Sequence, residues 1–264
     1  MIVAGVDVGS LTAKALLLDD GRQVLSRRVV ATGARAAEAA QTAYSGALAD
    51  AGLSQADVVY VLATGYGRAR VPFAHDQVTE ITCHARGIAH LLPATQTLLD
   101  VGGQDSKAIR LGPGGRVVDF AMNDKCAAGT GRFLEVMARA LEVDVADLGA
   151  LAAQARQAAR ISSTCTVFAE SEVVGLVGAG RLPADIAAGL HLAIAERLLG
   201  LLHQVVWTPP VAMSGGVAYN AGVVRALEAR LGTPVTVPPE PQLVGALGAA
   251  LLALDRVSAK GAGH

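Results

Sequence analysis

Two segments of this 264-residue chain repeat one pattern of aspartate, glycine and lysine, D-V-G-x-x-x-x-K-A. The first copy contains Asp7, Gly9, Ser10, Leu11, Thr12 and Lys14, and the second contains Asp100, Gly102, Gly103, Gln104, Asp105 and Lys107. Glycine lets a backbone turn tightly against a ligand, hydroxyl and amide groups donate to phosphate oxygens, lysine adds positive charge, and aspartate holds Mg²⁺. The pattern therefore predicts two phosphate-binding hairpins for a nucleotide such as ATP, although Asp-Gly and Gly-Gly turns also occur in ordinary hairpins.

A third glycine-containing segment follows a short apolar run at 211–214 and precedes a helix-like stretch at 223–231. Gly215, Gly216 and Val217 lie where a backbone can approach a ribose or a flat ring, so we expect them to flank adenosine. Gln242 begins a small-residue helix and is added to this set. The chain has neither a P-loop nor a dinucleotide-binding glycine motif.

Two of the three cysteines are placed like metal ligands. Cys126 precedes a helix-like stretch at 132–141, Cys165 precedes one at 167–177, and Cys83 lies in an apolar stretch typical of a buried thiol. Helix N-termini stabilise thiolates. Two thiolates complete neither a zinc site nor an iron–sulfur cluster, whereas a two-fold homodimer would supply four. The histidines show no metal-ligand spacing, and we interpret them as surface or hydrogen-bonded core residues.

The elements that must position these residues are also duplicated. In each copy an apolar strand enters the motif, a second apolar run leaves it, and a glycine-containing turn follows. We predict an α/β protein of two related domains with a nucleotide cleft between them. The first domain comprises residues 1–92, and the C-terminal helix returns to pack against it. The second comprises residues 93–255 and carries the candidate cluster ligands Cys126 and Cys165, and residues 256–264 form a flexible tail.

The composition indicates a folded protein of a reducing compartment. The chain is 52% hydrophobic and 17% charged, with a net charge of -1, so it folds and carries no basic field for nucleic acid. Charged residues or histidine interrupt every long apolar stretch, so we expect no membrane span. The N-terminus lacks the positive region of a signal peptide, and three cysteines do not make a disulfide framework, so we expect a cytoplasmic protein.

The three glycine segments together resemble the acetate and sugar kinase, Hsc70 and actin superfamily, which implies two actin-like, ribonuclease H-like domains. A closer resemblance is to the ATP-dependent activators of 2-hydroxyacyl-CoA dehydratases, a group that includes the ATPase subunits of benzoyl-CoA reductase. It covers residues 2–255. It is carried by T-G-Y-G-R at 64–68, E-I-T-C-H-A-R-G at 80–87, the second hairpin at 100–107, N-D-K-C-A-A-G-T-G-R-F-L-E at 123–135, and residues 165–172.

The resemblance implies an ATPase coupled to electron transfer. A [4Fe-4S] cluster shared by Cys126 and Cys165 of two subunits would receive an electron from ferredoxin or flavodoxin, and the homodimer would pass it to a dehydratase. Asp7 and Asp100 would hold Mg²⁺, mostly through waters, while Gln104 or Asp105, with Asp7, would act on the attacking water. The alternatives are a benzoyl-CoA reductase subunit, a small-molecule kinase of the same fold, and a nucleotide-gated assembly protein.

Overall fold

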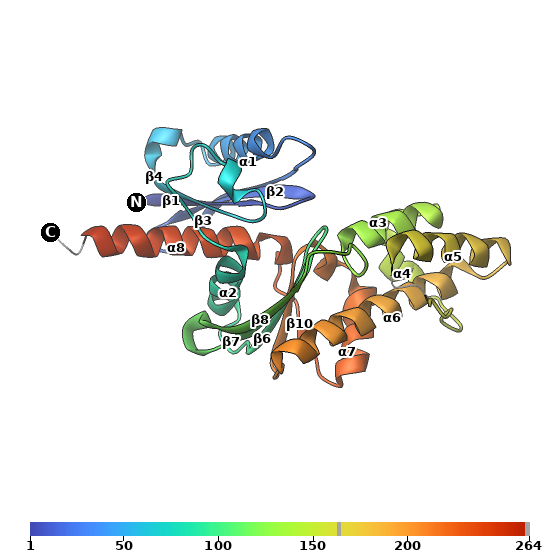
Figure 1. Ribbon diagram of the computed structural model, residues 1–264. Helices are drawn as coiled ribbons and strands as arrows, with labels where there is room; N and C mark the ends of the chain where they lie inside the picture. The colour runs from blue at the N-terminus through green and yellow to red at the C-terminus, as the bar shows by residue number, and fades with distance from the viewer. Residues whose placement is uncertain (163–164, 262–264) are drawn as a thin grey trace. The chain divides into compact units, whose positions relative to one another are not determined.

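The chain folds into two compact α/β units (Figure 1). The computed structural model describes residues 1–162 and 165–261. The first unit comprises Met1–Ala94, Leu111–Val117 and the chain from Gln242 onward, and the second comprises Thr95–Arg110 and Val118–Pro241. The boundaries expected at 92/93 and 255/256 stay a prediction. Within the predicted tail, residues 256–261 continue the last helix, and 262–264 lie outside the described residues.

The sheet of the first unit has the strand order β3-β2-β1-β4-β5. The central strand, β1, pairs antiparallel with β2 and parallel with β4. The strands are β1 (Ile2–Val8), β2 (Thr12–Asp19), β3 (Val24–Ala31), β4 (Val58–Thr64) and β5 (Asp76–Gln77). The helices are α1 (Ala36–Asp50), α2 (Glu80–Leu91) and α8 (Val244–Gly261), with short 3-10 turns η1 (Gln55–Asp57), η2 (Arg68–Arg70), η3 (Pro113–Gly115) and η7 (Pro241–Leu243).

Helices cover both faces of this sheet, so its central strands β1 and β2 are apolar apart from the residues near their ends, among them Asp7 and Lys14. Alternate residues of a strand point to opposite faces. Ala4 and Val6 of β1 therefore pack in one cluster with α1, whereas Val3 packs in another with α8. Figure 1 shows α8 running along one face of the sheet, with α1 on the other. The carboxyl ends of β1 and β4, where the first motif begins, are thereby held from both sides.

The second unit repeats the arrangement with the order β10-β9-β6-β7-β8. Its central strand, β6, pairs antiparallel with β7 and parallel with β9. The strands are β6 (Thr97–Val101), β7 (Ser106–Leu111), β8 (Val117–Asn123), β9 (Val211–Ser214) and β10 (Val235–Thr236). Because each motif lies between a central strand and its antiparallel neighbour, the expected duplication and the α/β fold class are confirmed.

Five helices belong to the second unit, among the residues that the structure describes. They are α3 (Gly131–Ala140), α4 (Leu148–Ala152), α5 (Thr166–Gly178), α6 (Pro183–Leu202) and α7 (Ala221–Leu231), with 3-10 turns η4 (Val145–Asp147), η5 (His203–Val205) and η6 (Gly216–Tyr219). Leu134, Leu190 and Leu198 lie in one apolar core that α3, α6 and the sheet share. The helices expected at 132–141, 167–177 and 223–231 are present with ends shifted by one or two residues.

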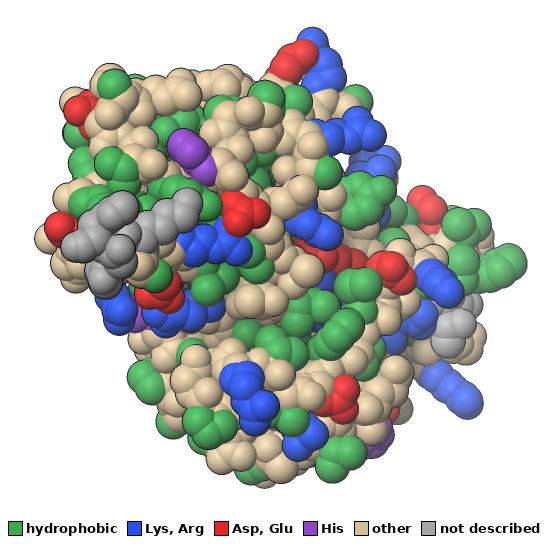
Figure 2. Space-filling model, turned by 60° about the vertical axis from the view of Figure 1, so that its left-hand side comes forward, with side chains coloured by type: hydrophobic (Ala, Val, Ile, Leu, Met, Phe, Trp, Pro, Cys, Tyr) green, Lys and Arg blue, Asp and Glu red, His purple; other side chains and the backbone are tan. Residues whose placement is uncertain are grey.

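Two helical segments, Pro183–Val205 and Pro241–Ala259, are long and apolar enough to cross a membrane by length and composition alone. In the structure 56% and 61% of the residues in their most apolar windows are buried. Burial against a sheet or neighbouring helices accounts for such apolar sequences. On the face shown in Figure 2, positive and negative side chains are interspersed among apolar ones.

Helices α2 and α8 cross at small residues. A Cβ on Gly248 of α8 would fall onto the carbonyl oxygen of Cys83 and 3.0 Å from the amide nitrogen of Gly87, both on α2. The two backbones therefore approach each other as closely as glycine permits. This close approach brings the residues around Cys83 against the carboxyl ends of β1 and β4.

Replacement of Gly248 by alanine should destabilise the first unit by about 3 kcal/mol, because the new methyl group must push two helix backbones apart. The matched control is Gly200→Ala in α6, where a Cβ meets nothing within 4 Å. That change should be neutral or stabilising by up to about 1 kcal/mol, since alanine is the better helix former. Urea unfolding measures both, and equal free energies of unfolding for the two variants would contradict the packing described.

Candidate functional site

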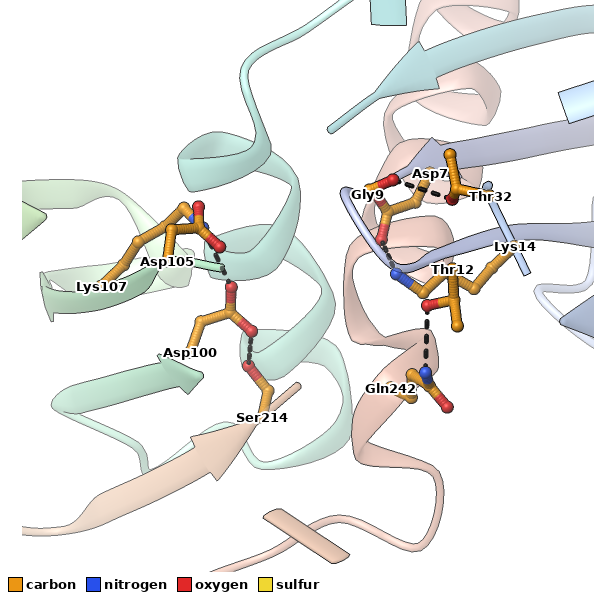
Figure 3. Close-up of polar contacts among 10 residues, drawn as sticks. All are labelled: Asp7, Gly9, Thr12, Lys14, Thr32, Asp100, Asp105, Lys107, Ser214 and Gln242. Carbon is orange, nitrogen blue, oxygen red and sulfur yellow. Dashed lines mark hydrogen bonds and ion pairs between the residues drawn. The ribbon is translucent and has the colours of Figure 1, made fainter. Parts of the chain in front are cut away.

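The first hairpin brings Asp7 and Lys14 directly opposite each other. They are paired residues in the β1–β2 register, and Lys14 Nζ lies 3.1 Å from Asp7 Oδ2 (Figure 3). Asp7 is only 4% exposed. Opposite positions of an antiparallel pair place two Cβ atoms close together on one face. The seven-residue spacing of aspartate and lysine thus produces a buried ion pair at the open end of the sheet.

The turn between these residues is closed by four hydrogen bonds. Gly9 N donates to Thr12 O at 3.0 Å, Thr32 N donates to Leu11 O at 2.9 Å, and Thr32 Oγ1 donates to Gly9 O at 2.8 Å. Gln242 Nε2 donates to Thr12 Oγ1 at 3.0 Å (Figure 3). Gln242, which the sequence placed beside adenosine, therefore contacts the first phosphate-type turn in this structure.

The second hairpin repeats the ion pair and adds a further carboxylate. Asp100 and Lys107 are opposite in the β6–β7 register. Lys107 Nζ lies 3.4 Å from Asp100 Oδ2 and 2.6 Å from Asp105 Oδ2, with Lys107 only 1% exposed (Figure 3). Gly102 N donates to Asp105 O and closes the turn at 3.0 Å. Of the two candidates for orienting water, Asp105 is held by lysine and Gln104 is exposed.

A matching pair of strand ends completes each half-site. In the strand registers Asp7 pairs with Thr64 at the end of β4, and Asp100 pairs with Ser214 at the end of β9. The next residues, Gly65 and Gly215, both have a φ of +86°. A Cβ on Gly65 would fall on Asp7 Oδ1, and one on Gly215 would lie 3.0 Å from Asp100 Oδ1. Glycine is required at both positions by conformation and by space.

Thr64 and Gly65 were not assigned a role from the sequence. The signal was present, because V-L-A-T-G at 61–65 matches V-A-M-S-G at 211–215 as an apolar strand followed by a hydroxyl residue and glycine. Gly215 packs directly against the Asp100 carboxylate, and the side chain of Val217 is buried in the core of the second unit. Gly216 begins η6, so Gly216 and the backbone of Val217 are the groups left to approach a nucleotide.

The cysteines differ in their settings. Cys165 is the N-cap residue of α5, and its carbonyl oxygen accepts the first helical hydrogen bond, from Ala169 N at 2.9 Å. Cys126 precedes α3 by several residues, and its carbonyl oxygen accepts from Asn123 Nδ2 at 3.1 Å. Both are partly exposed. Among the described residues, no group of three or more His, Cys, Asp or Glu side chains is arranged to hold a metal.

Cys83 and the histidines contrast with these cysteines. Cys83 is fully buried, and desolvation raises the pKa of its thiol to about 12, so it is the buried apolar residue expected. His191 of α6 corrects the prediction of hydrogen-bonded core histidines. It is 3% exposed, its Nδ1 and Nε2 have no hydrogen-bond partner in the described structure, and desolvation with nearby Arg225 lowers its pKa to about 4.

The chain is similar to proteins of one ATPase family. The model of the BadF/BadG/BcrA/BcrD ATPase family matches residues 4–253. The activator of lactoyl-CoA dehydratase from Anaerotignum propionicum is 48% identical over 260 residues, 98% of this chain and 100% of that protein. The (R)-2-hydroxyglutaryl-CoA dehydratase activating ATPase from Acidaminococcus fermentans is 45% identical over 255 residues, 96% of this chain and 97% of that protein.

Solved structures agree with the sequence comparison. The activator of 2-hydroxyisocaproyl-CoA dehydratase from Clostridium difficile with bound ADPNP has a TM-score of 0.95 at 41% identity, covering 100% of this chain and 98% of that one. A benzoyl-CoA reductase subunit from Thauera aromatica is 34% identical over 260 residues, 95% of this chain and 92% of that protein. A ROK hexokinase from Thermus thermophilus shares the fold alone, at 19% identity and a TM-score of 0.53, over 98% of this chain and 100% of that one.

Replacement of His191 by leucine should reduce the pH dependence of stability. Between pH 6.5 and 4 the unfolded chain binds a proton at His191 that the folded chain does not, so stability falls as the pH falls through this window. At about 1.4 kcal/mol per pKa unit, the native chain should lose about 2 kcal/mol more than the variant between pH 7 and 5. Urea unfolding at both pH values measures the difference, and equal losses would refute a buried neutral imidazole.

Proposed function

The chain belongs to the BadF/BadG/BcrA/BcrD ATPase family, and we propose that it is the ATP-hydrolysing activator of a 2-hydroxyacyl-CoA dehydratase. In this function ATP hydrolysis drives the delivery of a low-potential electron to the dehydratase. The names of the relatives support the dehydratase as partner, since they are activators of lactoyl-CoA and (R)-2-hydroxyglutaryl-CoA dehydratases. The contacts of the second unit support the coupling of nucleotide to electron transfer.

The observation that carries the proposal is a backbone connection between the second hairpin and the Cys126 segment. Gly131 N donates to Gly102 O at 2.9 Å, and Arg132 N donates to Gly103 O at 2.8 Å. These donors are the first two residues of α3, and Cys126 lies just before that helix. A phosphate group that displaces the hairpin therefore displaces the start of α3, and with it the segment that carries the cysteine.

When ATP binds at the hairpins, its phosphate groups would compete with the aspartates for the lysine side chains. Lys14 and Lys107 are each paired with a buried aspartate. Phosphate oxygens would take over these ammonium groups, and Asp7 and Asp100 would then be free to hold hydrated Mg²⁺. Gln104 orients the attacking water more readily than Asp105, because Lys107 already holds the Asp105 carboxylate.

The donor set fits a [4Fe-4S] cluster shared by two subunits. Cys126 and Cys165 are partly exposed thiols, one at a helix N-terminus, and two subunits supply the four thiolates that such a cluster needs. The cluster, when bound, supplies a one-electron carrier. Helix α5 exposes the apolar side chains of Val167, Phe168 and Val174, with Phe168 69% exposed, which suits burial in a homodimer.

The remaining partners follow from this role. Ferredoxin or flavodoxin supplies the electron, the dehydratase accepts it, and the acyl-CoA substrate is bound by the dehydratase rather than by this chain. Hydrolysis of ATP returns the hairpins to their lysine-paired state, which makes the transfer one-way. We place this function in the cytoplasm and expect neither nucleic acid nor a membrane to take part.

The cluster assignment predicts the metal content of the protein. Anaerobically purified chain should be a brown dimer with about two irons and two sulfides per subunit, bleaching in air. Cys126→Ser should lose at least about nine-tenths of the iron while its ADP affinity stays within about twofold. Cys83→Ala is the matched control and should keep its iron, because that thiol is fully buried. Full iron in Cys126→Ser would refute the ligand assignment.

The similarity to a benzoyl-CoA reductase subunit favours a second candidate function, that of an ATPase within a stable reductase complex. Purification of the chain from its native source separates the two functions. A dissociating activator should elute as a homodimer that stimulates a separate dehydratase, whereas a reductase component should elute with other cluster-bearing subunits. A phosphorylated metabolite among the products would indicate a kinase instead.

A further inference from the structure

The segment E-I-T-C-H-A-R-G at 80–87 has no role in the function described so far. It forms the first two turns of α2, and Thr79 caps the helix by accepting a hydrogen bond from Thr82 N. His84 lies on the buried side of these turns and is 5% exposed. A histidine so deeply buried beside a nucleotide-binding turn needs a physical reason.

The direction of the His84 side chain is given by Gly245 of α8. A Cβ built on Gly245 would lie 2.7 Å from His84 Nε2 and 3.1 Å from Asp7 Oδ2. The imidazole edge and the carboxylate therefore converge on the same gap in the surface of α8. Any larger residue at 245 would fill the gap, so glycine is what admits the histidine to the aspartate.

The duplicated half-site shows what such a group replaces. In the second unit Ser214 Oγ donates to Asp100 Oδ1 at 2.9 Å (Figure 3). Thr64 occupies the same register position beside Asp7, yet its buried Oγ1 lies against the Cys83 thiol and makes no hydrogen bond to Asp7 within the part of the chain described. Each aspartate has its own lysine partner and its own neighbouring glycine with positive φ. The two differ in the further side chain that approaches the carboxylate, which is Ser214 at Asp100 and His84 at Asp7.

We propose that His84 is a positioning residue for Asp7, approaching the carboxylate beside Oδ2, the oxygen that Lys14 contacts, so that Asp7 stays oriented when phosphate draws Lys14 away. The inference rests on the proposed role of Asp7 in holding hydrated Mg²⁺. An isolated buried carboxylate is strongly unfavourable. Without a second donor, Asp7 would turn with Lys14 and lose the orientation that binds the hydrated metal.

The test compares His84→Ala with His84→Gln, whose side-chain amide can donate from nearly the position of Nε2. We expect His84→Ala to lower kcat for ATP hydrolysis at least tenfold and to raise the half-saturating Mg²⁺ concentration about tenfold, with KM for ATP at saturating Mg²⁺ within about twofold. ADP affinity measured calorimetrically in EDTA should also stay within about twofold. His84→Gln should recover most of kcat.

His90→Gln is the matched control, because it changes the same residue type to the same amide on the same helix and should leave every value unchanged. Gly245→Ala is the second variant, since its methyl group separates His84 from Asp7; it should reproduce the Mg²⁺ shift provided that its melting temperature is near native. Normal kcat and Mg²⁺ dependence in His84→Ala overturn the inference. So does an equal loss in His84→Ala and His84→Gln, because that result reports packing alone.

Asp7→Asn separates this inference from the function on which it rests. If Asp7→Asn hydrolyses ATP normally, the proposed role of Asp7 fails and the inference fails with it. If Asp7→Asn is impaired while His84→Ala is normal, the role of Asp7 stands and only the inference fails. Impairment of both, with ADP binding in EDTA retained, supports the two together.

Discussion

Each unit of this protein depends on one buried aspartate at the carboxyl end of its central strand. Asp7 and Asp100 lie among apolar strands, where an isolated carboxylate would be strongly unfavourable, and the hairpin register supplies a lysine directly opposite each of them. In the proposed function the same charges would serve the nucleotide, because lysine would bind phosphate and aspartate would bind hydrated metal. The ion pair that stabilises each buried aspartate without nucleotide would therefore be the pair that ATP separates in the proposed function.

Close backbone packing is the second constraint, and it follows from the first. Backbone packs directly against the carboxylates at glycines, namely Gly65 and Gly215 just after the neighbouring strands and Gly245 on α8. The core is built mainly from aliphatic residues, with Tyr44 and Phe133 among its few aromatic side chains, in agreement with an aromatic content of 3%. Such contacts are rigid, so a shift of a hairpin is passed to the elements bonded to it rather than absorbed locally.

The sequence predicts the duplicated hairpins well because their spacing is local: aspartate, glycine and lysine within eight residues determine both the turn and the ion pair. It also predicts α3 and α5 to within one or two residues, because helix signals are local too. It does not predict that His84 meets Asp7, since that contact depends on how α2 crosses α8. For the same reason it missed the role of Gly65, a residue far from Asp7 along the chain but adjacent to it across β1 and β4.

Although the two half-sites arise from one repeated pattern, they differ in the residues that hold each hairpin. Two identical aspartate–lysine pairs would respond identically to phosphate. In the second unit Asp100 is held by Ser214, and the backbone bonds of Gly102 and Gly103 tie its hairpin to α3. In the first unit the hairpin is tied through Thr12 to Gln242, and His84 approaches the aspartate. A ligand shifts a conformation only by its difference in affinity for the two states. The second hairpin is hydrogen-bonded to the start of α3, the helix that follows Cys126. In the proposed function it is therefore where the binding energy of phosphate would be converted into displacement of Cys126.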